Sequence, residues 1–88
     1  MTVIDVVREF LGTQLRIADV QDVDPDWPLV QRGVIDSIEL MQIVAFVEER
    51  FGIAVDDTEV VPGNFRTLSA IAGFVARKQT AGHHTNGT

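Results

Sequence analysis

The sequence contains no cysteine, and this absence excludes disulfide bridges, thiolate metal sites and thiol nucleophiles. It has no apolar run near the ~20 residues that a membrane-spanning helix needs. Positive charge is scarce, with 7 Lys and Arg against 13 Asp and Glu and a net charge of −6. Nucleic acids and anionic membranes are bound through basic patches, so we expect neither as a partner. The acidic balance favours a basic docking site on another protein.

The chain is small, and its 88 residues allow one domain. A hydrophobic content of 45% supplies one modest core. The N-terminus has an early acidic residue, Asp5, and no basic segment, unlike a signal peptide. We therefore expect a monomer in the cytoplasm. Residues 79–88, QTAGHHTNGT, have no apolar pattern and are predicted to form a disordered tail after a domain of residues 1–78.

Helical periodicity is present in three segments, residues 2–11, 36–51 and 67–78. A short helical turn is expected within residues 57–65, where Pro-Gly interrupts the pattern. No segment has the alternation of a strand. These patterns predict an all-α fold, a small four-helix bundle of three main helices and one short one. A long first loop over residues 16–36 is often a sign of function in a domain of this size.

The ends of these helices have recognisable capping residues. Thr2 with Asp5, and Asp36 with Glu39, fit capping pairs, and Gly52 is suited to end the second helix. Thr67 is expected to cap the last one. The apolar stripes predict the following core residues: Val3, Val7, Phe10, Leu11, Leu40, Ile43, Val44, Val47, Phe51, Leu68, Ile71, Ala72 and Val75. From the first loop, Val20, Val23, Trp27, Leu29 and Val30 are expected to pack against them, with Trp27 as an anchor.

Two polar clusters are weak candidates for metal binding. Asp22 to Asp26 alternate as in a calcium loop, but Trp27 stands where that loop needs glycine and Gly33 where it needs an acidic ligand. A solvated acidic loop explains these residues better. The adjacent His83 and His84 are the only histidines, and we interpret them as part of a polar tail. We predict no metal site and no catalytic residue.

The segment GVIDSIEL, which surrounds Ser37, carries the strongest chemical signal. A helix start alone explains Asp, Ser and Glu there. However, the hydroxyl of Ser37 is expected to be exposed in the first turn. A phosphate on it would lie near free backbone N–H groups at the positive end of the helix dipole. No base is placed to activate this serine, so it is expected to be a substrate of another enzyme.

GVIDSIEL resembles the prosthetic-group attachment motif of acyl and peptidyl carrier proteins, and the following EERFGI and VVPGNF extend the resemblance to Lys78. The resemblance implies a four-helix bundle with a long first loop. It implies a 4′-phosphopantetheine arm on Ser37, transferred from coenzyme A by a phosphopantetheinyl transferase. The terminal thiol of this arm would hold the cargo as a thioester. The protein would then be a carrier without catalytic activity.

The resemblance also implies roles for residues near Ser37. Asp36 would cap the helix and help the transferase place its metal ion. The outward face of the helix is the expected partner surface, with apolar contacts from Ile38 and Met41 and charged contacts from Glu48 and Glu49; Gln42 and Ala45 complete it. Expected partners are the transferase, an adenylating ligase or acyltransferase that loads the arm, and downstream synthase or tailoring enzymes.

The subclass is predicted from details of the motif. Gly33 lies three residues before Asp36, and Ile38 rather than Leu follows Ser37. This spacing resembles that of free-standing aminoacyl or peptidyl carriers more than that of fatty-acid carriers. It predicts a role in nonribosomal peptide or related secondary-metabolite biosynthesis. The alternatives are a fatty-acid or polyketide acyl carrier, and a helical interaction module that receives no prosthetic group. A small hydrolase using Ser37 is disfavoured because no histidine is placed beside it.

Overall fold

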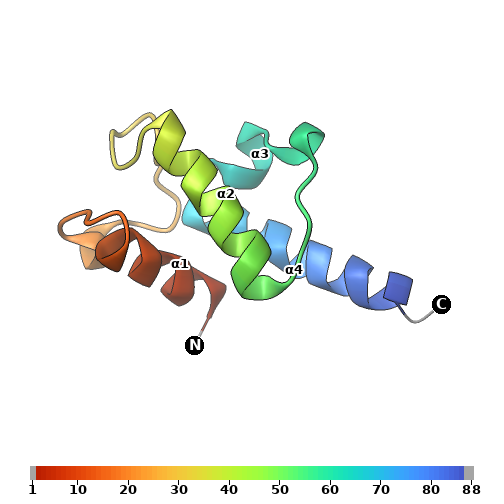
Figure 1. Cartoon of the computed structure of the whole chain (residues 1–88). Helices are drawn as coiled ribbons and strands as arrows, with labels where there is room; N and C mark the ends of the chain where they lie inside the picture. Colours follow the sequence, from red (N-terminus) through yellow and green to blue (C-terminus); the bar gives the residue numbers. More distant parts are fainter. Residues whose placement is uncertain (1, 87–88) are drawn as a thin grey trace.

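A computed structural model describes the backbone of residues 2–86 and the side chains of residues 2–80. Four α-helices follow one another: α1 (Val3–Thr13), α2 (Ser37–Phe51), α3 (Pro62–Phe65) and α4 (Leu68–Asn86). Two short 3₁₀ helices, η1 (Val20–Asp22) and η2 (Asp57–Glu59), interrupt the connections. In Figure 1, α2 lies across the front of the molecule, α4 runs behind it, and α3 lies at the upper right. The predicted fold, three main helices and one short one, is confirmed.

Helix α1 begins at the predicted cap. The Thr2 hydroxyl accepts the N–H of Asp5 at 3.1 Å, and the Asp5 carboxylate accepts the N–H of Thr2 at 3.2 Å. The hydrogen bond from the Thr2 N–H to the carboxylate is the main cause of the lowered pKa of Asp5. Arg8 is half-buried and donates to the carbonyls of Gln21 and Val23 at 3.5 and 3.0 Å. Arg8 therefore holds the first loop against α1.

The first loop packs closely on the helices. Val23 and Leu29 are buried as predicted, whereas Val30, predicted to pack against the helices, is 43% exposed. The Trp27 ring is half-buried, with the Arg32 guanidinium 3.9 Å above its centre. Asp24 accepts the N–H of Asp26 at 2.8 Å, which makes a local turn. Among the described side chains, no group of three or more potential ligands could hold a metal ion.

Two backbone hydrogen bonds join this loop to the start of the last helix. The Leu29 N–H donates to the Arg66 carbonyl at 2.9 Å, and the Ser69 N–H donates to the Pro25 carbonyl at 3.0 Å. These bonds hold side by side two segments that are about forty residues apart in sequence. They also give hydrogen-bond partners to backbone groups that folding removes from water.

Helix α2 has the bounds that its capping residues predict. Asp36 accepts the N–H of Glu39 at 2.7 Å, and Glu39 accepts the N–H of Asp36 at 2.9 Å. The helix ends at Gly52, which has a left-handed φ of 64° that glycine adopts without strain. Ile43, Val44 and Val47 are buried beneath the outward face; Leu40 and Phe51 are only half-buried.

Helix α4 begins where expected and ends later. The Thr67 hydroxyl accepts the N–H of Ala70 at 2.9 Å, which confirms the predicted cap. The helical backbone then continues to Asn86, so the predicted end at Lys78 is wrong. The division between a domain of residues 1–78 and a tail stays a prediction. The side chains of His83 and His84 lie outside the described residues.

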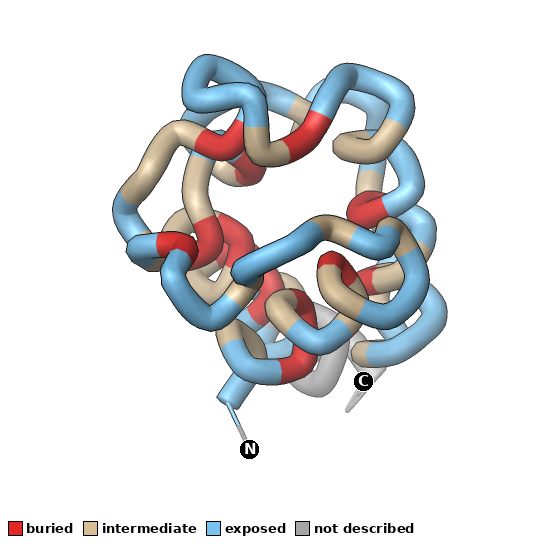
Figure 2. The backbone as a smooth tube through the Cα atoms, turned by 90° about the vertical axis from the view of Figure 1, so that its left-hand side faces the viewer, coloured by how far each residue is buried: buried red, intermediate tan, exposed pale blue. Residues whose placement is uncertain are grey.

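The buried side chains form one core shared by all the main segments. Figure 2 marks the buried positions along the backbone in red. The apolar stripes predicted most of this core, but they missed four buried residues: Val6, Ile35, Phe65 and Phe74. Phe65 of α3 packs on Phe74 of α4 with ring centres 5.1 Å apart, and this pair fixes α3 to α4. Within the described residues, no helix combines the length and the apolar character needed to cross a membrane.

Candidate functional site

Ser37 is the first residue of α2, and its side chain is exposed. Asp36, also exposed, is engaged by the capping hydrogen bonds described above. The first N–H groups of a helix have no intrahelical acceptor, and Asp36 accepts only that of Glu39. The N–H groups of Ser37 and Ile38 therefore remain at the positive end of the helix beside the hydroxyl.

A groove of about 340 Å³ opens beside Ser37, with mostly apolar walls. Three segments form it: the first loop, the start of α2, and the stretch from η2 to Arg66. Its lining residues are Pro28, Val30, Gln31, Ser37, Leu40, Val60, Val61, Pro62, Phe65 and Arg66. Arg66 supplies a positive charge to this lining. The serine hydroxyl thus lies at the edge of an apolar groove with one cation in its walls.

Large exposed apolar side chains gather around this groove. Ile38 is 74% exposed and Met41 51%, as the predicted partner surface requires, and Val30 and Val61 of the groove are each 43% exposed. Sequence periodicity could not find Val30 and Val61 because they lie in loops. Exposed apolar side chains grouped in this way often mark a contact with another molecule.

The other predicted surface residues lie farther along α2. Gln42, Ala45 and Glu49 are exposed and line a second, more open groove between α1 and α2. Its lining includes the rings of Phe10 and Phe46, which stack with centres 4.2 Å apart. The predicted surface therefore runs along one face of α2, from Ile38 and Met41 near Ser37 to these three residues beside α1.

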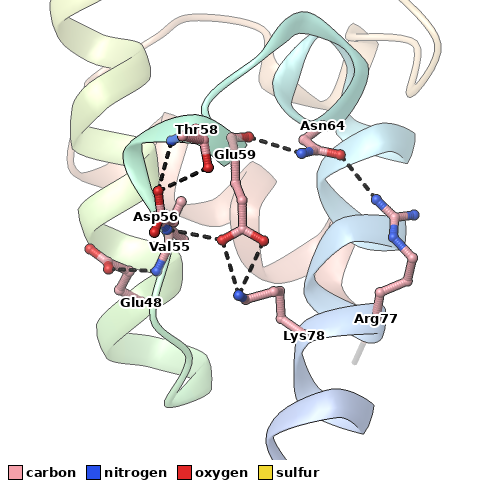
Figure 3. A network of polar contacts seen from close by, with 8 residues as sticks. All are labelled: Glu48, Val55, Asp56, Thr58, Glu59, Asn64, Arg77 and Lys78. Atoms are coloured by element: carbon pink, nitrogen blue, oxygen red, sulfur yellow. Dashed lines mark hydrogen bonds and ion pairs between the residues drawn. The ribbon is translucent and has the colours of Figure 1, made fainter.

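Glu48 differs from its neighbours, because it is half-buried and accepts the N–H of Val55 at 2.9 Å. It belongs to a polar network that ties α2, η2 and α4 together (Figure 3). The sequence pattern predicts Glu48 on the outward face of the helix and does not indicate its contact with Val55. Its carboxylate thus has a structural partner, whereas Glu49 has none among the described side chains.

Two other carboxylates of this network have lowered pKa values. The pKa of Asp56 is lowered mainly by hydrogen bonds from Thr58, and that of Glu59 by the Asp56 N–H and then by Lys78. A carboxyl whose pKa is lower in the folded state stabilises the fold above its unfolded value. This contribution is lost as the pH falls below the ordinary values of 3.8 and 4.5.

Replacing Asp36 tests the cap at the start of the site. Asp36→Ala is expected to lower the free energy of unfolding by about 1 kcal/mol, since the Glu39 N–H loses its acceptor. Asp36→Asn retains an acceptor and is expected to keep most of that stability. Urea unfolding of both variants measures the difference; equal losses would contradict the capping role.

The site offers attachment rather than catalysis. Among the described side chains there is no histidine, and no contact places a base on the Ser37 hydroxyl. An exposed hydroxyl, free N–H groups at a helix start, and an adjacent apolar groove with a cation suit a phosphodiester followed by a flexible arm. The residues present thus fit a phosphopantetheine group, which supplies a thiol that this cysteine-free chain does not have.

Comparison with known proteins gives consistent relatives. The sequence profile of the family described as "Phosphopantetheine attachment site" matches residues 3–75. The "Probable acyl carrier protein PigG" of Serratia sp. is 24% identical over 67 residues, covering 76% of this chain and 77% of that protein. Acyl carrier proteins of Desulforapulum autotrophicum and Solidesulfovibrio magneticus are each 32% identical over 59 residues, or 67% of this chain. These alignments cover 77% and 74% of the two proteins.

A solved structure shares the fold. The chain superposes with a TM-score of 0.67 on a protein described as "Crystal structure of FAD-dependent dehydrogenase", covering 78% of this chain and 97% of that one at 22% identity. This likeness concerns the helical arrangement alone. The family profile matches most of the chain, and it confirms the resemblance and the predicted prosthetic group. The chain belongs to the phosphopantetheine attachment site family, and is a non-catalytic carrier with a covalent 4′-phosphopantetheine group.

Proposed function

We propose that Ser37 is the attachment residue and that the arm delivers a thioester-bound acyl or aminoacyl group to partner enzymes. The observation that carries this proposal is the exposed Ser37 hydroxyl at the start of α2, at the edge of the apolar groove. The carrier makes no bonds itself. A tethered substrate reaches each active site at a high effective concentration, which is the advantage of a covalent arm.

The test is the mass of the intact chain after incubation with coenzyme A, Mg²⁺ and a broad-specificity phosphopantetheinyl transferase. The expected product carries one phosphopantetheine, and tandem mass spectrometry of a proteolytic digest is expected to place it on Ser37. A modified residue elsewhere would refute the assignment of Ser37. A folded chain that two different transferases leave unmodified would instead support the unmodified interaction module.

Asp36→Asn separates two roles of the residue before the serine. It keeps an acceptor for the Glu39 N–H but removes the negative charge. If Asp36 also helps the transferase to place its metal ion, this variant is expected to be folded yet modified more slowly. Modification at the wild-type rate would leave capping as its role.

The apolar residues beside Ser37 are proposed to dominate partner binding. Ile38→Ala and Met41→Ala are each expected to reduce kcat/KM for modification by the transferase about three- to tenfold, because apolar burial at the interface is lost. Glu49→Gln is expected mainly to slow association and to weaken its salt dependence. Initial rates at low and high salt measure both effects.

Glu48→Gln and Gln42→Ala complete this series. Glu48 is bound to the Val55 N–H, so its carboxylate is less available to a partner than that of Glu49. Gln42 and Ala45 lie beside α1, away from the groove of Ser37, and Gln42→Ala is expected to have the smaller effect. Unchanged rates in the Ile38, Met41, Glu48 and Glu49 variants together would remove this surface from the proposal.

Within the family, we favour a monomeric cytoplasmic carrier of the aminoacyl or peptidyl type. The support is the Gly33-Val34-Ile35-Asp36-Ser37-Ile38 run and the VVPGNF segment before the last helix. The relatives named above are acyl carrier proteins, and a fatty-acid or polyketide carrier is the alternative. Incubating the modified chain with ATP and an amino-acid-adenylating ligase, or with an acyltransferase and its acyl-coenzyme A, distinguishes them by the mass that is added.

A further inference from the structure

The segment from Asp57 to Asn64 forms one wall of the groove beside Ser37, through Val60, Val61 and Pro62. Its side chains bury little surface. None of its residues is buried, and Val60 is only half-buried. The four-residue helix α3 begins at Pro62, and the residue before it, Val61, makes no side-chain capping hydrogen bond. The position of this wall therefore depends on the contacts that it makes with other elements.

Two cations of α4 hold the middle of this wall (Figure 3). Lys78 Nζ lies 3.0 and 3.2 Å from the two carboxylate oxygens of Glu59. Arg77 donates to Asn64 Oδ1 at 3.0 Å, and Asn64 Nδ2 donates to the Glu59 carbonyl at 2.9 Å. Both cations thus act on Glu59, one directly and one through Asn64.

The two ends of the wall are fixed by separate contacts. Before it, the Val55 N–H is bound to Glu48 of α2. After it, Phe65 is buried against Phe74, and the Arg66 carbonyl accepts the N–H of Leu29. Loss of the contact between Glu59 and Lys78 would therefore remove the direct tie between the middle of the wall and α4. The contact through Asn64 and Arg77 and both ends of the wall would stay in place.

We propose that the Glu59–Lys78 ion pair is a clasp that positions the groove wall, and that its release opens the groove beside Ser37 while the bundle stays folded. The two side chains are 30% and 28% exposed, so water and salt reach them. Such a pair is weak enough to open often. Lys78 and Glu59 are positioning residues, because they act through Val60 and Val61. The clasp requires no modification of Ser37, so it is tested apart from the proposed function.

The absence of cysteine makes a direct test available. Val60→Cys places a single thiol on the groove wall, and its reaction with 5,5′-dithiobis(2-nitrobenzoate) reports how often the wall opens. In the unmodified 88-residue chain, adding Lys78→Gln is expected to raise this rate about two- to fivefold. Salt at about 1 M is expected to raise the rate of the Lys78 chain and to leave that of the Lys78→Gln chain nearly unchanged.

Matched variants separate the clasp from a general loss of stability. Lys78→Arg is expected to restore slow reaction because it restores an ion pair and leaves the hydrogen bond from the Asp56 N–H to Glu59 in place. Val44→Cys places a thiol in the core that only wider unfolding exposes, and Lys78→Gln is expected to leave its rate unchanged. Equal acceleration of Val44→Cys and Val60→Cys, or no acceleration of Val60→Cys, would overturn the clasp.

Discussion

Ser37→Ala is expected to abolish phosphopantetheine attachment completely, leaving the intact mass of the variant unchanged after incubation with coenzyme A and a transferase. The reason is chemical, because the variant lacks the oxygen that would form the phosphodiester. Little loss of stability is expected, since the Ser37 side chain is exposed and the cap of α2 comes from Asp36. Circular dichroism and urea unfolding check that the unmodified variant is folded.

The chain contains its own control for this experiment, because Ser69 is its only other serine. Ser69 lies in the first turn of α4, is half-buried, and donates its backbone N–H to Pro25. Ser69→Ala keeps that backbone contact and is expected to be modified as fast as the wild type. Residual modification of Ser37→Ala that disappears only in the double variant would place an arm on Ser69 and contradict the single-site proposal.

Phe65→Ala is expected to lower the free energy of unfolding by about 3–5 kcal/mol. Phe65 is 2% exposed, and it is the only buried side chain of α3. Its removal leaves a cavity against Phe74 and also removes part of the groove lining. The stability of a small domain is itself only about 5–15 kcal/mol, so the variant is expected to be near the limit of folding.

Val61→Ala provides the comparison on the same groove. Val61 is 43% exposed, so its truncation is expected to change the free energy of unfolding by no more than about 0.5 kcal/mol. Urea midpoints of both variants, with the slope of the transition held constant, give the two values. Similar losses in the two variants would contradict the assignment of Phe65 to the core.

The elements predicted most accurately are those with strong local signals. Helix α2 begins at the cap formed by Asp36 and Glu39 and ends at the left-handed Gly52, as the sequence predicts. Both signals act within a few residues. Phe74, which the predicted core omits, lies three residues after Ile71 on the same helix and therefore fits the same helical periodicity. The backbone beyond Lys78 has no apolar repeat, so no periodic signal could mark its continuation to Asn86.

The part of the site that lies within one continuous motif could be predicted from the sequence. The part that is formed by segments distant in sequence could not. Ser37, Ile38 and Met41 lie on one helix, and their exposure follows from its geometry. The groove instead joins three separate segments, so Val61 and Arg66 gave no local sign of their place beside Ser37. The contact from Glu48 to Val55 likewise depends on how the chain returns after Gly52.

The two backbone hydrogen bonds between the first loop and the start of α4 have a consequence for engineering the chain. Pro25 and Leu29 are joined to Ser69 and Arg66, so an inserted residue between Pro25 and Leu29 would put one of these bonds out of register. By contrast, Ala18 and Asp19 are exposed at the turn before η1. An affinity tag or a reporter peptide is therefore better placed at that turn, where extra length is accommodated by solvent.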